Sequence, residues 1–536
     1  MGYVIAAIAG VMAAYIALWL VVSAVVLFLV PLFLVVLAVC VLCGVVYAPA
    51  IAALTLSGTG TWGAPVATPD DVVAGHLRLL WRKKSEPFAP DRAWPGYVAA
   101  QWRLDLVQMW YNGLEPLNRM LKRLNGFTKG LEMPILWTPL VIFLYGGWFA
   151  IVVGALLGAA VVVLLDILVI GPAWLGTVTA MLLVRSVDVL VRRRRKASGS
   201  CPTCHWVTML PAYPCDNCQE VHRDLRPGWL GVLWRRCRCG VRLPTTVLRA
   251  TKRLAPQCPR CDAPLRRGAG ALMDIRLPVF GPMSAGKTRL VYAALVAMRD
   301  RLSAVGGTLA FEDPGSRTAF DEAIEIIATG ASTQKTEQGP LPRPITAHAS
   351  NGRKEALLHL FDAAGEYFVD REDNTKLEFL DTAQGLVLVV DPFSVPWVAD
   401  QLTGARNSRL VEAHPASEAP EHVYQVTVRR LAEYGVRTSA RHLAIAVVKS
   451  DLLIDLPFAA ELRDGNAREW LNQAGLDNLV LSAERDFSEV RYFSVASVAN
   501  KSADALSPAT PFLWLMNAVG FTAGAGHPGE QPVSSS

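Results

Sequence analysis

The sequence predicts a multipass α-helical membrane region, followed by two small cysteine-rich modules and by an α/β domain with a mostly parallel sheet. Two long apolar blocks occupy most of residues 1–56 and 133–191. Eight cysteines then form four close pairs between residues 201 and 261. After residue 272, several apolar runs have the length and composition of buried strands.

Composition and charge support this division of the chain. The 536 residues are 52% hydrophobic and only 18% charged, with a mean hydropathy of +0.31, whereas soluble domains are typically about 25% charged. Lys and Arg outnumber Asp and Glu by 11 to 9 in residues 1–190 and by 17 to 4 in residues 191–270, but are outnumbered 24 to 33 in residues 271–536. A basic middle segment therefore separates an apolar N-terminal region from an acidic C-terminal domain.

Each apolar block is too long for one membrane helix. Residues 3–56 would span about 80 Å as a single helix, against a hydrocarbon core of about 30 Å. We therefore expect a transmembrane hairpin in residues 1–56, with Pro31 in the first turn of its second helix. A second hairpin is expected in residues 133–191, with its turn at either 154–160 or 166–172. A cleaved signal peptide fits poorly, because no basic segment precedes the first block.

Basic residues give the orientation. The segment "VRRRRKAS" at 191–198 follows the second block, and residues 57–132 hold ten Lys and Arg. Both segments are therefore expected on the cytoplasmic side of the cell membrane. Within residues 57–132, an amphipathic pattern around Trp102, Trp110 and Leu117 fits either a small helical domain with its own core or a helix in the headgroup layer.

The cysteine pairs predict two zinc ribbons in residues 198–268. "CPTC", "CDNC", "CRC" and "CPRC" each present two thiolates from a tight turn, and Zn²⁺ takes four ligands in a tetrahedron. Pairing neighbours along the chain gives one site from Cys201, Cys204, Cys215 and Cys218, and a second site from Cys237, Cys239, Cys258 and Cys261. A crossed pairing is the alternative, and His205 or His222 is a possible substitute ligand. Both sites are closed, which predicts a structural role. Cys40 and Cys43 lie in an apolar helix and are expected to pack only.

The basic segment 192–267 also suggests partners. Because it follows a membrane block, anionic lipid headgroups are the simplest partner, and nucleic acid is a less favoured one.

A phosphate-binding loop begins the C-terminal domain, expected over residues 272–520. The strand "MDIRLPVF" leads into G-x-x-x-x-G-K-T and then a helix. In that context the loop N–H groups and the helix N-terminus bind phosphates, Lys287 reaches the β- and γ-phosphates and Thr288 ligates Mg²⁺. The expected loop residues are Gly281, Ser284, Ala285, Gly286, Lys287 and Thr288.

Two later strands end in aspartate, and a third segment predicts the base. Asp362 continues as D-x-x-G, which favours it as the magnesium carboxylate, whereas Asp391 is expected to cap a loop. The strand ending in Lys449-Ser450-Asp451 offers a carboxylate that can accept hydrogen bonds from guanine N1–H and N2–H₂, with the lysine stem along the purine. Ala496 or Ser497, in the loop after the strand "VRYFSV", is expected to back the base.

Together, "GPMSAGKT", "FDAAGE" and "VVKSD" resemble the GTPases of the translation-factor and Ras-like class. With the cysteine pairs and apolar blocks, the chain is similar to the bacterial double-GTPase domains that often accompany membrane and zinc-ribbon segments. The resemblance implies a Ras-like α/β fold, GTP and Mg²⁺ as ligands, and a regulatory role in stress or conflict responses. It also implies that Gly365 senses the γ-phosphate and that Thr336, with Thr333 as its rival, is the switch threonine.

This chain departs from the class at two positions. Val448 stands where the base motif normally begins with Asn or Thr, which removes a polar tie to the phosphate loop. Glu366 occupies the place of the water-positioning Gln, so slow intrinsic hydrolysis is expected unless a partner or self-association supplies a missing charge. A protein effector or activator is the expected partner.

We therefore expect a membrane-anchored GTPase. Two alternatives are an ATP-driven membrane machine with Asp391 as its metal carboxylate, and a nonenzymatic nucleotide-binding scaffold. Residues 521–536, rich in Gly, Pro and Ser, are expected to form a disordered tail.

Overall fold

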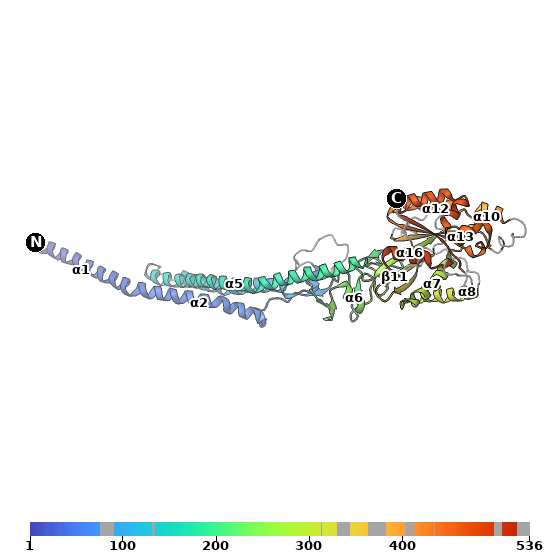
Figure 1. The fold of residues 1–536 in the computed structure, drawn as a ribbon. Coiled ribbons are helices and arrows are strands. Elements are labelled where there is room, and N and C mark those ends of the chain that lie inside the picture. Colours follow the sequence, from blue (N-terminus) through green and yellow to red (C-terminus); the bar gives the residue numbers. More distant parts are fainter. Residues whose placement is uncertain are drawn as a thin grey trace. The chain divides into compact units, whose positions relative to one another are not determined.

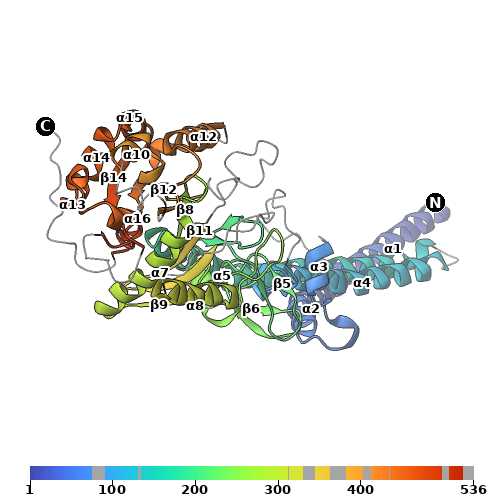
Figure 2. The same ribbon diagram turned by 90° about the vertical axis from the view of Figure 1, so that its right-hand side faces the viewer.

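The computed structural model describes residues 1–74, 91–130, 134–311, 313–329, 344–362, 382–402, 411, 413–433, 435–497 and 506–522. The chain divides into two compact units (Figures 1 and 2). The first comprises Met1–Ser186 and Arg226–Thr245, and the second comprises Val187–Leu225 and Thr246–Ser536.

Unit 1 is mainly helical. Its elements are α1 (Gly2–Ala24), the π-helical η1 (Val25–Leu29), α2 (Val30–Leu56), the short helices η2 (Gly60–Trp62), α3 (Pro69–Ala74) and η3 (Tyr97–Ala99), α4 (Gln101–Lys129) and α5 (Pro134–Arg194, of which residues 187–194 belong to unit 2). The strands β1 (Ala93–Trp94), β6 (Trp234–Cys237) and β7 (Arg242–Pro244) form an antiparallel sheet.

The two predicted hairpins are not present. Residues 2–56 form one helical run through η1, and α5 is a single helix of 61 residues. Pro31 lies in the first turn of α2, as expected, but the π-helical residues of η1 lead directly into that turn, so the chain continues instead of reversing. Both runs are long and apolar enough to cross a membrane by length and composition.

Helices α2 and α5 run parallel and touch backbone to backbone. A Cβ at Gly154 would lie 2.1 Å from the Val41 carbonyl oxygen, and one at Gly44 would lie 2.3 Å from that of Ile151. Gly158, one turn beyond Gly154, meets Val45 in the same way. Small residues four apart let apolar helices approach closely, and this spacing is typical of helix pairs in membranes.

Helix α4 packs against these two helices, which neither interpretation of residues 57–132 predicted. The Tyr47 hydroxyl donates to the Gly113 carbonyl (3.0 Å), and the Trp148 indole donates to the Leu117 carbonyl (3.2 Å). The amphipathic stripe of α4 therefore covers apolar surface of α2 and α5 instead of a separate core.

Unit 2 is built on a seven-stranded sheet. Its spatial order is β14 (Glu489–Ser494), β13 (His442–Val447), β12 (Gly385–Val390), β8 (Met273–Phe280), β11 (Glu355–Asp362), β10 (Ile345–Ser350) and β9 (Thr308–Ala310). The neighbours from β14 to β11 are all parallel, and β10 is antiparallel to both β11 and β9. The mostly parallel α/β sheet is as predicted.

Helices cover both faces of this sheet (Figure 2). On one face, α7 (Lys287–Ala304) and α16 (Thr510–Val519) pack on alternate residues of β8, such as Ile275 and Leu277, with α8 (Pro314–Thr329) against α7. The other face carries a second core. Among the described residues, the other helices of this unit are α6 (Val247–Arg253), η6 (Pro392–Ser394), α10 (Pro396–Gln401), α12 (Pro420–Glu433), η8 (Thr438–Ala440), η9 (Ser450–Leu452), η10 (Pro457–Ala459), α13 (Ala460–Arg463), α14 (Ala467–Gln473) and α15 (Asp477–Asp486).

Part of the ribbon region belongs to the same unit as the sheet, which differs from the predicted boundary at residue 272. The short hairpins β2 (Gly199–Ser200) with β3 (Val207–Thr208) and β4 (Tyr213–Pro214) with β5 (Val221–His222) lie in unit 2. Ser198 and Ser200 donate to buried Asp274 of β8 (3.3 and 3.4 Å), and the His205 ring lies 5.8 Å from that of Phe361 in β11. At the other end, Phe521 is fully buried in the core, so the domain extends past residue 520; residues 523–536 lie outside the described part.

Candidate nucleotide site and cysteine groups

The phosphate loop joins the end of β8 to the start of α7. Gly281 packs against β12, since a Cβ there would lie 2.7 Å from the Val389 carbonyl oxygen. Ser284 and Gly286 have φ angles of 64° and 92°, so the loop turns through left-handed conformations before the helix starts. Ala285 is buried. The loop lies at the carboxyl end of β8, between β11 and β12, where parallel α/β sheets bind ligands.

Lys287 is anchored within the loop. The residue is 7% exposed, and its ammonium donates to the carbonyls of Gly281 (2.9 Å) and Pro282 (2.8 Å). These contacts hold a positive charge under the loop, where phosphate oxygens bound by the loop N–H groups would lie.

Thr288 and Asp362 come together as predicted for a magnesium site. The Thr288 hydroxyl donates to Asp362 Oδ2 at 2.6 Å. Asp362 ends β11, whose parallel register pairs it with Val279 at the end of β8. A hydroxyl and a carboxylate oxygen are hard ligands of the kind that Mg²⁺ takes beside substrate phosphates. Thr336, its rival Thr333, Gly365 and Glu366 lie outside the described residues.

The predicted base-binding segments converge beside this loop. The Lys449 Cε lies 4.0 Å from the position that a Cβ on Gly286 would take. Asp451 lies in η9 after β13, and the N–H of Ser450 donates to the Val495 carbonyl (3.2 Å), which ties this turn to the segment after β14. In that segment Ala496 is buried, and the Ser497 carbonyl accepts from the Arg289 guanidinium of α7 (3.3 Å).

Asp391 has the loop-capping role that was predicted for it. It is fully buried at the end of β12, and its Oδ1 accepts from the Phe393 N–H at the start of η6 (3.1 Å). Its Oδ2 accepts from the Ala416 N–H (2.9 Å) and from the Lys449 ammonium (2.6 Å). Burial raises the pKa of Asp391, and the lysine and the two N–H groups oppose that rise. The ion pair with Lys449 was not predicted, because the two residues are 58 positions apart.

The eight cysteines pair differently from the neighbour pairing. Cys201, Cys204, Cys258 and Cys261 form one group and Cys215, Cys218, Cys237 and Cys239 form the other, with the four Sγ atoms of each within 4.8 Å of one another. This is the crossed alternative. The first and fourth cysteine pairs form the first group, and the second and third pairs, which lie between them in the sequence, form the inner group. Mutual hydrogen bonds between Ala212 and Gln257 (2.9 and 2.7 Å) join the two segments that flank the inner group.

The first group fits zinc. Three of its Sγ–Sγ distances are 3.5, 3.6 and 3.7 Å, and a tetrahedron with Zn–S bonds of about 2.3 Å has edges of about 3.8 Å. Its two turns are alike: the residue after each second cysteine, His205 or Asp262, has a left-handed φ and donates its N–H to the carbonyl of the first cysteine (both 3.0 Å).

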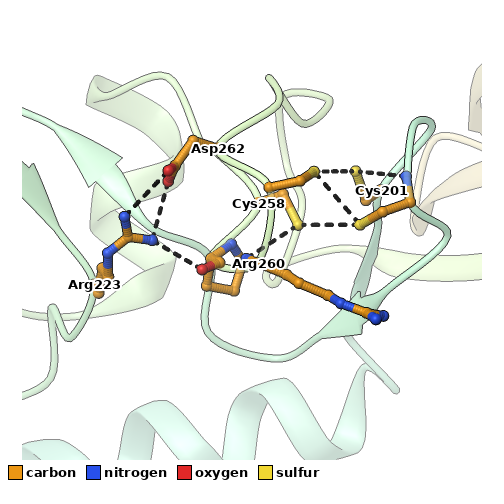
Figure 3. A network of polar contacts seen from close by, with 8 residues as sticks. Cys201, Arg223, Cys258, Arg260 and Asp262 are labelled. Carbon is orange, nitrogen blue, oxygen red and sulfur yellow. Dashed lines mark hydrogen bonds and ion pairs between the residues drawn. The ribbon is translucent and has the colours of Figure 1, made fainter. Parts of the chain in front are cut away.

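Polar contacts surround this group (Figure 3). Backbone N–H groups donate to the sulfurs of Cys201 and Cys258, and Arg223 holds the fourth turn through the Pro259 carbonyl (2.8 Å) and the Asp262 carboxylate (3.0 Å). Burial raises the pKa of Cys201 and Cys204, and a bound cation would favour their thiolate forms.

The strand, loop and helix with Lys287, Thr288 and Asp362 define an α/β nucleotide-binding domain of the P-loop class. Residues 275–510 match the model of the family described as Double-GTPase 2, which confirms the predicted P-loop domain of the double-GTPase type. The match supports a GTP-binding protein, with Mg²⁺ as the usual companion of the nucleotide. No curated protein matches the chain.

Proposed function

We propose that this chain is a membrane-anchored GTP-binding protein that hydrolyses GTP slowly, or only with a stimulating partner, and acts as a regulatory switch. The observation that carries the proposal is the contact between Thr288 and Asp362 beside the lysine-bearing loop. This contact places a hydroxyl and a carboxylate where they would ligate an Mg²⁺ ion bound to the β- and γ-phosphates. Bound Mg²⁺ would neutralise charge on the phosphates; Lys287 would bind and orient them.

Guanine specificity is assigned to Asp451. Asp451 is half-buried, and a bound base would cover it. A covered carboxylate without its two guanine donors costs about 1–3 kcal/mol, which is roughly tenfold to several hundredfold in affinity. The ATP alternative receives no support from Asp391, because both of its oxygens accept hydrogen bonds from Phe393, Ala416 and Lys449.

Anchoring in a cell membrane is proposed from the two long apolar runs and from the close glycine contacts between α2 and α5. Arg192–Arg194 in the last turn of α5 favour a cytoplasmic position for the ribbons and the nucleotide domain. Anionic headgroups remain the proposed partner of the basic segment 192–267, and an activating protein the proposed partner of the switch. A role in stress or conflict responses is proposed from the family resemblance alone.

Nucleotide competition on the detergent-solubilised full chain tests the function. The wild type is expected to prefer GTP over ATP and to turn GTP over slowly. Lys287→Ala should weaken all triphosphates alike, whereas Asp451→Asn should weaken GTP and favour xanthosine triphosphate. Equal binding of ATP and GTP, with a ratio unmoved by Asp451→Asn, would show that the guanine assignment is wrong; binding without any turnover would favour the scaffold.

A further inference from the structure

The base-binding lysine is held at both ends. Its backbone has a left-handed φ of 55° at the end of β13, and its ammonium contacts the buried Asp391 carboxylate (2.6 Å) and the His414 carbonyl (3.2 Å). Between these ends, the Lys449 stem passes the last glycine of the phosphate loop, with Cε 4.0 Å from the Cβ position of Gly286. The Lys449 side chain is therefore held alongside the phosphate loop.

The preceding residue contributes no polar tie to this arrangement. Val448 is 2% exposed, and its N–H donates to the Val390 carbonyl (3.0 Å), continuing the pairing of β13 with β12. The side chain offers no hydrogen bond that could fix the turn that follows. Asp391, at the end of the neighbouring strand β12, instead supplies a negative charge that pairs with the Lys449 ammonium.

We propose that Asp391 is a positioning residue for purine binding, which acts by fixing Lys449 and so replaces the polar tie that Val448 lacks. The inference rests on the proposed nucleotide function. A lysine left free would lose rotamer freedom when its stem packs on a base, and a lysine already fixed avoids that loss. Asp391 would then set the affinity for any purine, while Asp451 chooses among purines.

The carboxylate is suited to this role and to no metal role. It is fully buried, and besides Lys449 it accepts hydrogen bonds from the N–H groups of Phe393 and Ala416, which fix its own rotamer. The Thr288 hydroxyl contacts a different carboxylate, that of Asp362.

A double-mutant cycle on the full chain in detergent tests the proposal. The variants are Asp391→Asn, Lys449→Met, which keeps the length of the stem but removes the ammonium, and the two combined. Each single variant should weaken GTP and inosine triphosphate by about tenfold, equivalent to about 1.4 kcal/mol, and leave the weaker binding of uridine triphosphate unchanged. Because both act through one ion pair, the double variant should bind no more weakly than the weaker single variant.

The controls separate positioning from folding. Ser394→Ala removes a hydrogen bond to the Asp391 backbone carbonyl (2.8 Å) without touching the ion pair, and should leave all affinities unchanged. If Asp391→Asn fails to fold, judged by thermal melting and zinc content, Lys449→Met decides alone: wild-type affinity for GTP would overturn the inference. Additive losses in the cycle, or an equal loss for uridine triphosphate, would also overturn it. A wild type that binds no GTP would instead overturn the proposed function together with the inference.

Discussion

Three aspartates on adjacent strands show how neighbours decide a residue's role. Asp362 contacts Thr288, Asp391 contacts Lys449, and Asp274, near the start of β8, contacts His359 at 2.8 Å. In the sequence each is one carboxylate in an apolar run. Only Asp362 carried a motif that revealed its partner, because the other two partners come from distant strands and leave no local pattern.

Asp274 is the centre of a buried polar network that joins the first cysteine turn to the sheet. Ser198 and Ser200 donate to its carboxylate, His359 contacts it from β11, and Thr346 of β10 hydrogen-bonds the other ring nitrogen of His359 (3.0 Å). Burial acts to raise the pKa of Asp274, but His359 and Arg276 hold it below its ordinary value.

Replacing Asp274 by Asn should destabilise unit 2 by about 3–5 kcal/mol at neutral pH, the usual cost of breaking a buried charge pair. Because the folded-state pKa is depressed, the stabilisation is present above about pH 4, the ordinary pKa of Asp, and is lost as the pH falls through the folded-state value. Denaturant unfolding of wild type and variant should therefore converge in acid. Asp300→Asn, at an exposed position beside Arg299, is the control and should cost little; a pH-independent difference for Asp274→Asn would contradict the prediction.

At the scale of elements, the sequence predicted which segments form but not which of them associate. Each cysteine pair specifies a metal-binding turn through its own spacing, so four turns were predictable. Any two turns can complete a tetrahedron, and the choice depends on the chain path between residues 212 and 257. The apolar runs likewise specified helices, whereas the absence of a turn at Pro31 depends on a π-helical stretch that has no sequence signature.

The crossed cysteine pairing predicts different consequences for two similar mutations. Cys258→Ser removes a ligand from the group in unit 2, where His205 contacts Phe361 next to Asp362. It should release one zinc, lower the melting temperature of the nucleotide domain and weaken GTP binding. Cys237→Ser affects the other group and should release one zinc with GTP binding largely intact.

Zinc content by elemental analysis and GTP affinity of both variants check this prediction. Equal effects of the two mutations on GTP binding would contradict the coupling of the first group to the sheet, and a protein without zinc would contradict both sites.

The glycine contacts between α2 and α5 make a second prediction at this scale. Gly154→Leu would place a side chain where a Cβ already lies 2.1 Å from the Val41 carbonyl oxygen, so the helices must separate. Cysteines introduced by Phe33→Cys and Phe143→Cys, whose rings are 4.6 Å apart, report on this packing by disulfide formation in a Cys40→Ser background. Cross-linking should fall sharply with Gly154→Leu but persist with Gly176→Leu, which has open space around its Cβ position; unchanged cross-linking in the first variant would contradict the contact.

For the molecule as a whole, the order of regions along the chain was predictable, but two boundaries were not. Composition shifts sharply near residues 191 and 272, and the long apolar helices, the cysteine groups and the α/β sheet follow one another in that order in the structure. The first cysteine group nevertheless belongs to the unit of the sheet, because polar contacts with Asp274 and ring contact with Phe361 are long-range and buried. The burial of Phe521 in the core was also not predictable, because a single buried ring in a Gly-rich segment carries no periodic pattern.

The continuous helix over residues 2–56 changes the expected membrane topology. A hairpin would return the chain to its starting side, so Met1 and the loop after Leu56 would both be cytoplasmic. One helix that crosses once places them on opposite sides. Because α5 is also one continuous helix, Arg192–Arg194 at its cytoplasmic end then place the segment before Pro134 outside the cell and Met1 in the cytoplasm, whereas the ten Lys and Arg of residues 57–132 favour the hairpins. We expect the single crossings: an impermeant reagent should label a tag inserted after Gly58 in intact cells, and should label tags before Met1 and after Ser536 only after lysis. Protection of the inserted tag in intact cells, with labelling after lysis, would restore the hairpins and show that both helices bend within the bilayer.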